Sequence, residues 1–145
     1  MSKKFLSIDY GSKFIGLASF NQGVDPFPLM EDRIQNFDIG KSLQLIVQII
    51  NNEFITDLIW GVPHLLDGSE TSTTREIRSI GEKIKPLLEA SKSPCQVHFF
   101  DETLSTYQAK ETMKTSPAFN FKVDLRKVDS LSARIILEDF LKLNI

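Results

Sequence analysis

Short apolar runs separated by polar turns recur along the first hundred residues of the chain. Four of them have the length and the flanking residues of buried strands, and they occupy residues 5–8, 14–20, 57–61 and 96–100. Only Gly11-Ser12-Lys13 separates the first run from the second, which predicts a hairpin. A fifth strand is expected near residues 28–33.

Longer segments, in which apolar residues recur every three or four positions, predict helices between and after these strands. They occupy residues 39–52, 71–90, 104–113 and 128–143. Pro86 marks a kink or a boundary within the second of them. A meander of strands, followed by alternating helices and strands, indicates a mixed α/β sheet with helices packed on it. We expect one domain that spans residues 1–145.

Composition narrows the class of protein. Hydrophobic residues make up 41% and charged residues 25% of the 145 residues, which excludes wholesale disorder. No apolar run approaches the ~20 residues of a membrane span, and the single cysteine, Cys95, excludes an internal disulfide or a multi-cysteine zinc site. We therefore expect a cytoplasmic protein without membrane contact. A net charge of −2 argues against coating of nucleic acid by overall charge, but not against a local patch.

Acidic residues follow two of the expected strands. Asp9 ends the first, Asp101 and Glu102 end the run at 96–100, and Asp129 begins the last helix. If those two strands are neighbours, these carboxylates meet at the sheet edge where such sheets bind ligands. Clustered carboxylates raise one another's pKa unless a cation offsets the repulsion, and Mg²⁺ is a suitable cation. Two such ions ~4 Å apart would clamp the attacking water and the leaving oxygen of a phosphodiester.

Each acid also has a purely structural interpretation. Asp9 can close a turn with its side chain, and Asp101 or Glu102 can cap the helix at 104–113. Asp129 can complement the positive end of its own helix. Spacing alone leaves these alternatives open.

Four blocks of sequence resemble one family. Residues 5–18 (FLSIDYGSKFIGLA) resemble the opening of YqgF/RuvX proteins, which are described as pre-16S rRNA nucleases or Holliday junction resolvases. Three further blocks are similar to the family's Gly-Leu-Pro…Asp-Gly-Ser/Thr-Glu loop, its Asp-Glu-Arg-Leu-Ser/Thr-Thr stretch and its closing helix: residues 61–70, 101–106 and 127–137. The blocks occur in the family's order across nearly the whole chain, and the combination is specific.

The resemblance implies an RNase H-like fold, with a five-stranded mixed sheet whose first three strands are antiparallel and helices on both faces. It implies a metal-dependent endonuclease with a catalytic and metal-binding trio of Asp9, Glu102 and Asp129, and Asp101 as the alternative for the middle position. The expected cofactor is Mg²⁺ or Mn²⁺, with two ions. The expected reaction is 5′-end processing of pre-16S rRNA in ribosome biogenesis, or resolution of Holliday junctions. The partners would be an rRNA precursor or branched DNA, and the ribosome, with the enzyme a monomer or a homodimer.

Two departures from the family affect phosphate binding. The chain has Thr103 where the family commonly has Arg, and Leu65 where it commonly has Asn. Arg grips a phosphate with two hydrogen bonds, so Lys13 or Arg126 would have to replace it electrostatically.

The segment 110–127 contains five basic and two acidic residues together with Phe119 and Phe121, which would either stack on bases or pack on the core. The loop at 67–70 has two interpretations. It can be a turn that leads into a helix, with Ser69 or Thr71 as the helix cap, or it can bind a phosphate through free backbone amides at the helix start. Together these considerations give the substrate-binding candidates Lys13, Ser69, Thr106, Lys122, Arg126 and Lys127.

Two other functions remain as hypotheses. Thr103 favours a non-catalytic nucleic-acid-binding or ribosome-binding module of the same fold. Residues 9–12 also resemble the first phosphate loop of actin-like ATP-binding domains, although those proteins place the nucleotide between two such domains and this chain has one. His64, His98 and Cys95 form no ligand-spaced cluster, and Trp60 is expected in the core.

Overall fold

The computed structural model describes residues 2–102 and 105–144, except for the side chains of 105–108. Its elements are β1 (Lys4–Asp9), β2 (Phe14–Asn21), β3 (Leu29–Gln35), α1 (Ile39–Asn52), β4 (Asp57–Pro63), α2 (Ser72–Glu82), α3 (Ile84–Ala90), β5 (Gln96–Glu102), α4 (Ser105–Thr115), the 3₁₀ turn η1 (Pro117–Phe119) and α5 (Val128–Asn144). Within the described ranges, no helix is both long and apolar enough to cross a membrane.

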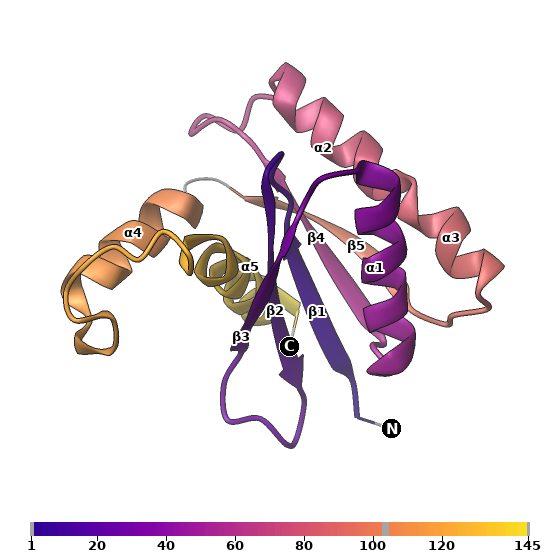
Figure 1. The fold of residues 1–145 in the computed structure, drawn as a ribbon, viewed down its shortest axis with the longest axis horizontal. Coiled ribbons are helices and arrows are strands. Elements are labelled where there is room, and N and C mark those ends of the chain that lie inside the picture. The colour runs from indigo at the N-terminus through magenta and orange to yellow at the C-terminus, as the bar shows by residue number, and fades with distance from the viewer. Residues whose placement is uncertain (1, 103–104, 145) are drawn as a thin grey trace.

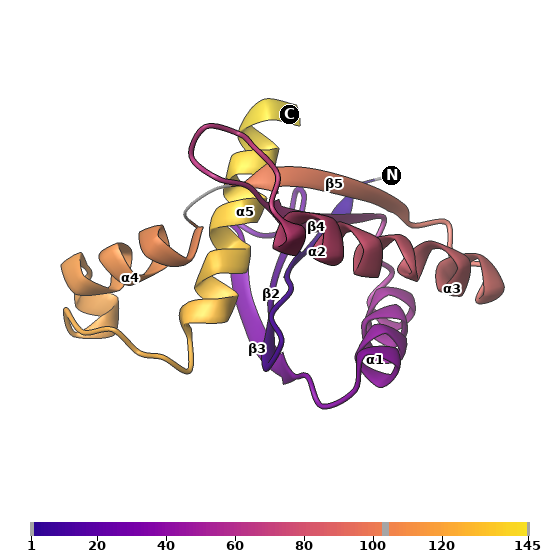
Figure 2. The same cartoon turned by 90° about the horizontal axis from the view of Figure 1, so that it is seen from above.

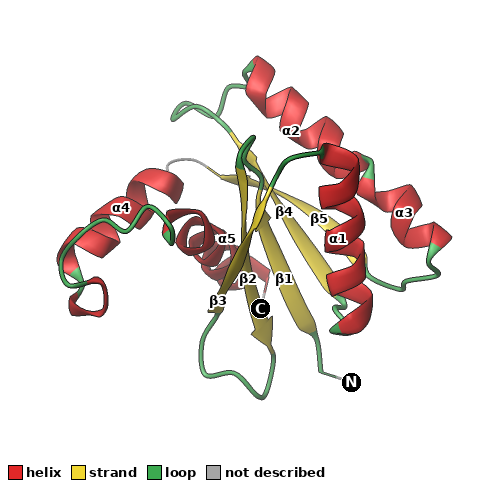
Figure 3. Ribbon diagram, in the orientation of Figure 1, coloured by secondary structure: helices red, strands yellow, loops and turns green. Residues whose placement is uncertain are grey.

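The five strands form one mixed sheet in the order β3-β2-β1-β4-β5 (Figures 1 and 3). Strands β1, β2 and β3 pair antiparallel, and β4 pairs parallel with both β1 and β5. The expected hairpin, the strand expected near residues 28–33 and the five-stranded mixed sheet are therefore confirmed. The supposition that the first and last strands are neighbours is wrong, because β4 lies between β1 and β5.

Helices cover both faces of the sheet (Figure 2). Helix α5 packs on one face, where Phe5, Ala18 and Ile59 meet Ile136 and Phe140. Helices α1, α2 and α3 cover the other face, where Leu6, Ile8 and Leu58 lie in a second cluster that includes the fully buried Trp60, as expected. Successive residues of each central strand thus point to different helices, and both faces of these strands are apolar.

The segment expected to form one helix over residues 71–90 is two helices. Lys83 ends α2 and precedes α3, so the break comes three residues before Pro86. Pro86 lies in the first turn of α3, where a helix tolerates the missing backbone N–H. The expected beginning of the next helix at Leu104 lies outside the described residues.

Candidate active site

The direction of the Asp9 side chain follows from the alternation of β1. Phe5 packs against α5, and the Ser7 hydroxyl donates a 2.6 Å hydrogen bond to the backbone carbonyl of Ala133 in α5. Asp9 is two residues further along, so it lies on the same face, at the carboxyl end of the strand. The site therefore begins where β1 ends beneath α5.

Close packing between β2 and α5 brings Asp129 to this point. Gly16 is the β2 partner of Asp9, and a β-carbon on Gly16 would overlap with the backbone carbonyl of Asp129. The Ser130 hydroxyl adds a 2.6 Å hydrogen bond to the carbonyl of Glu31 in β3. Because Gly16 lacks a side chain, the first turn of α5 lies directly on the strand that pairs with Asp9.

The alternation of β5 separates Glu102 from Asp101. The Phe100 ring packs edge-on against Phe140 of α5, with 5.9 Å between ring centroids, so Glu102 belongs to the α5 face. The Asp101 side chain is 72% exposed, and its Oδ1 lies 3.7 Å from Nε2 of His64. Glu102, rather than Asp101, therefore shares a face with Asp9.

Electrostatics show that the three acids converge. The pKa of the Asp9 carboxyl is raised from 3.8 to about 8, chiefly by burial and then by the negative charges of Glu102 and Asp129. A bound cation would offset the repulsion between these three carboxylates.

The donor set fits a hard divalent cation in kind and in charge, because it offers carboxylate oxygens from three half-buried acidic side chains. Asp9, Glu102 and Asp129 would be the residues that hold it. Among the described residues, no three histidine, cysteine or acidic side chains are arranged to enclose an ion as they stand. Asp129 is instead paired with Arg33, whose Nη1 lies 3.3 Å from Asp129 Oδ2.

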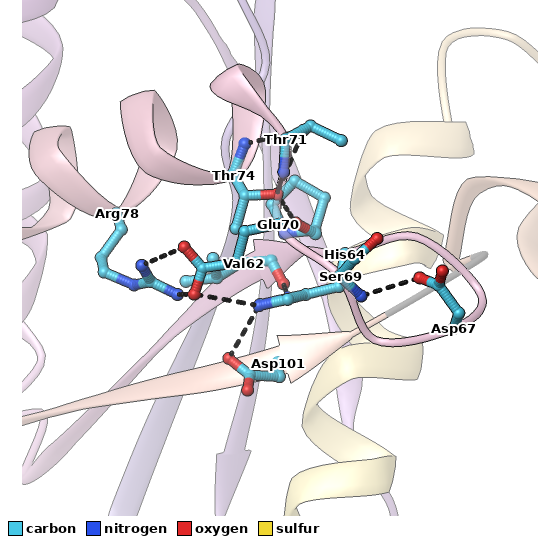
Figure 4. A network of polar contacts seen from close by, with 10 residues as sticks. Val62, His64, Asp67, Ser69, Glu70, Thr71, Thr74, Arg78 and Asp101 are labelled. Carbon is cyan, nitrogen blue, oxygen red and sulfur yellow. Dashed lines mark hydrogen bonds and ion pairs between the residues drawn. The ribbon is translucent and has the colours of Figure 1, made fainter.

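A polar network holds the loop between β4 and α2 beside this site (Figure 4). His64 Nδ1 donates to the carbonyl of Val62 (3.0 Å), and its Nε2 faces Asp101 and, at 4.0 Å, Glu70. Arg78 grips Glu70 with two hydrogen bonds of 3.0 and 2.9 Å, which hold the pKa of Glu70 below its usual value. The backbone N–H of His64 also donates to the carbonyl of Glu102 (2.9 Å), so the network fixes the end of β5 as well.

Thr71, rather than Ser69, caps α2. The Thr71 hydroxyl accepts from the N–H of Thr74, and the Thr74 hydroxyl accepts from the N–H of Thr71 and donates to the carbonyl of Pro63 (2.6 Å). Ser69 is exposed, and its N–H donates to Asp67. The turn-and-cap interpretation of this loop is thus confirmed, and Ser69 stays a substrate-binding prediction.

The structure divides the basic segment into packed and exposed parts. Phe119 packs on the cluster of Met113 and Val128, whereas Phe121 is 61% exposed. Lys13, Lys122, Arg126 and Lys127 are exposed. The side chains of Thr103 and Thr106 lie outside the described residues.

A groove of about 620 Å³ runs between β3 and the start of α5. Three cationic side chains line it, those of Arg33, Arg126 and Lys127, along with Phe119 and Ser130. The acidic Glu31 and Asp32 contribute to the same wall. Because Arg33 also contacts Asp129, the groove adjoins the acidic site.

Sequence reasoning missed two residues that shape this region. Arg33 stood in an uncertain strand with no motif around it, and only its tertiary contacts reveal it. His64 was given no role because it has no ligand-spaced partner, yet it anchors the loop beside Glu102. The signals in the sequence were the position of His64 shortly after the strand predicted at 57–61 and its place in the family-like block 61–70.

Comparisons with known proteins show which family model and which relatives this chain matches. The model of the RuvX family, described as "Holliday junction resolvase", matches residues 3–143. A protein of Maridesulfovibrio salexigens named "Putative pre-16S rRNA nuclease" is 31% identical over 141 residues, which cover 95% of this chain and 97% of the relative. A protein of Chlamydia pneumoniae with the same name is 34% identical over 144 residues, which cover 96% of this chain and 89% of the relative.

Solved structures share the fold at low sequence identity. Thermus thermophilus RuvC in complex with a Holliday junction substrate has a TM-score of 0.59 and 8% identity, and the match covers 98% of this chain and 96% of RuvC. Fowlpox virus resolvase in complex with Holliday junction DNA has a TM-score of 0.52 and 13% identity, and the match covers 98% and 99% of the two chains. These similarities confirm the RNase H-like architecture.

Proposed function

Since the chain belongs to the RuvX family of Holliday junction resolvases, we propose that it is a metal-dependent endonuclease that hydrolyses phosphodiester bonds in structured nucleic acid. The observation that supports this proposal is the raised pKa of Asp9, because the negative charges of Glu102 and Asp129 contribute to it, and it agrees with the close approach of Asp129 to the Asp9 strand partner, Gly16. The mutual repulsion of three carboxylates opposes folding, and a bound divalent cation would offset it.

Different residues of the chain bind the metal and the substrate. Asp9, Glu102 and Asp129 hold Mg²⁺ or Mn²⁺, and Asp9 must lose its proton before it can act as a ligand. Divalent ions held there would supply electrostatic stabilisation of the reacting phosphoryl group. The groove lined by Arg33, Arg126 and Lys127 offers positive charge to the phosphates on either side of the cut.

The proposed substrate is the precursor of 16S rRNA, because relatives that are 31% and 34% identical to this chain are named "Putative pre-16S rRNA nuclease". Branched DNA is the alternative, favoured by the family description. Either substrate would be met in the cytoplasm. A junction resolvase makes paired symmetric cuts and needs a homodimer, whereas trimming one RNA end needs only a monomer.

Cleavage assays with matched acid variants test the proposal. Asp9→Asn, Glu102→Gln and Asp129→Asn should each reduce cleavage by more than about 100-fold, the scale of losing several kcal/mol of transition-state stabilisation. Asp139→Asn is the control, because Asp139 lies on the same helix as Asp129 and pairs with Lys142. Asp101→Asn separates the two neighbouring acids of β5 and should stay within a few-fold of the parent.

The assay uses precursor rRNA and a four-way DNA junction with Mg²⁺, and the mass of the protein in solution is measured alongside. Parent-like cleavage by the folded trio variants would sink the site assignment. Salt-sensitive RNA binding without cleavage by the parent, in Mg²⁺ or in Mn²⁺, would instead favour the non-catalytic module.

A further inference from the structure

Arg33 occupies an irregular stretch of β3 beside the candidate site. Ile15 pairs with Ile34 and Leu17 pairs with Glu31, so two β3 residues, Asp32 and Arg33, lie opposite the single residue Gly16. An extra residue of this kind is a β-bulge, which redirects a side chain away from the regular alternation. The bulge sits opposite the same glycine that admits the backbone of Asp129.

Three contacts hold the guanidinium of Arg33 in one place. Its Cζ lies 3.6 Å from the centroid of the Phe14 ring, in cation–π geometry. Its Nη1 donates to the carbonyl of Leu125 (3.1 Å) and to Oδ2 of Asp129 (3.3 Å). The side chain is only 24% exposed, which makes it a fixed group rather than a solvated surface cation.

We propose that Arg33 is a positioning residue that holds one oxygen of the Asp129 carboxylate and so sets its orientation for binding a divalent cation. The Leu125 contact ties the segment before α5 to β3, and the Phe14 ring prevents the guanidinium from swinging away. Groups that orient a metal ligand in this way affect metal affinity by about 10- to 100-fold. The inference rests on the proposed metal-dependent nuclease.

Charge and geometry make opposite predictions, which gives the inference a sharp test. Loss of a positive charge beside three carboxylates would by itself strengthen cation binding. Loss of the support for Asp129 would weaken it. Arg33→Lys keeps the charge but replaces the planar fork by a single ammonium group, so it isolates the geometric contribution.

Mn²⁺ binding is measured by isothermal titration calorimetry on the metal-free full chain, for the parent, Arg33→Lys, Arg33→Gln and Phe14→Leu. We expect Arg33→Lys and Arg33→Gln to bind Mn²⁺ about 10-fold more weakly or worse. Phe14→Leu keeps Arg33 but removes the ring beneath it, and should weaken binding by several-fold. Arg134→Gln is the control, because Arg134 donates to a carboxylate of the same helix, Glu138 (3.1 Å), and is similarly exposed at 28%.

Thermal unfolding in chelator, followed by circular dichroism, establishes that each variant is folded. Parent-like or tighter Mn²⁺ binding by Arg33→Lys overturns the inference and leaves the proposed function intact. A parent that neither binds Mn²⁺ nor cleaves nucleic acid overturns both. If Arg33→Gln fails to fold, Arg33→Lys and Phe14→Leu decide the question.

Discussion

Gly16 lies against the backbone carbonyl of Asp129, and any β-carbon at residue 16 would overlap with that carbonyl. Gly16 is also the strand partner of Asp9 and faces the bulge that contains Arg33. One small residue thus admits the start of α5 to the point where three segments, distant in the sequence, supply charged side chains. The candidate site depends on this close approach between a strand and a helix.

Gly16→Ala should therefore damage both stability and the site. Pushing α5 away from β2 in a close-packed region costs roughly 1–3 kcal/mol, and nuclease activity should be lost with the displacement of Asp129. Urea unfolding and the cleavage assay measure the two effects. Gly40→Ala is the control, because the added β-carbon would meet only the side-chain Oδ1 of Asp38, and alanine favours the helix α1. A Gly16→Ala protein as stable as the parent would contradict the packing described here.

The raised pKa of Asp9 predicts how the stability of the metal-free protein depends on pH. Between pH 4 and about 8 the folded protein keeps a proton on Asp9 that the unfolded chain releases, so stability falls as pH rises through this window. Asp9→Asn cannot ionise, and it should flatten this dependence and exceed the parent in stability at pH 8. Urea unfolding in chelator, from pH 5 to 8.5, measures this for the parent, Asp9→Asn and the control Asp139→Asn. Parallel curves for parent and Asp9→Asn would show that Asp9 ionises normally.

Thr74 joins the helix cap of α2 to the end of β4, and its loss should destabilise the fold. Thr74→Val keeps the shape but leaves the Pro63 carbonyl and the Thr71 N–H without their partner, at a cost of about 1–3 kcal/mol. Thr74→Ser should restore part of the loss. Thr73→Val is the matched control, because Thr73 is the exposed neighbour in the same helix. Equal urea midpoints for the two valine variants would refute the role of Thr74.

The exposed cations of residues 122–127 predict the salt dependence of nucleic-acid binding. If Lys122, Arg126 and Lys127 contact phosphates, each change to Gln should weaken binding. Each change should also make the negative slope of log K against log salt concentration shallower by about 0.7–0.9. Binding is measured by fluorescence anisotropy, and every protein also carries Asp9→Asn so that the nucleic acid is not cleaved during the titration. Lys142→Gln, at the far end of α5, should leave the slope unchanged. A parent-like slope in all three variants would place the phosphates elsewhere on the molecule.

Local patterns in the sequence determined much of this protein. The strand runs, the hairpin at Gly11-Ser12-Lys13 and the helical periodicities follow from side chains that are near one another in the chain. The structure confirms the strands, the hairpin and the helices at 39–52 and 128–143, whereas the segment 71–90 divides into two helices at Lys83. The four family-like blocks determined the fold class, which the family match and the shared architecture confirm. Asp9, Glu102 and Asp129 were named as a trio from these blocks, and their catalytic role stays a prediction.

Tertiary structure alone decided which acids face one another. Both faces of β5 are covered, so both carry apolar residues: Phe99 packs on one side and Phe100 on the other. The sequence therefore shows no polar–apolar alternation that could tell which face Asp101 or Glu102 occupies. Three further features are equally invisible in the chain: the insertion of β4 between β1 and β5, the bulge that turns Arg33 toward Asp129, and the partial burial of Phe119 but not of Phe121. Each depends on which surface a distant segment packs against, and that choice is made by the free energy of the whole fold rather than by neighbouring residues.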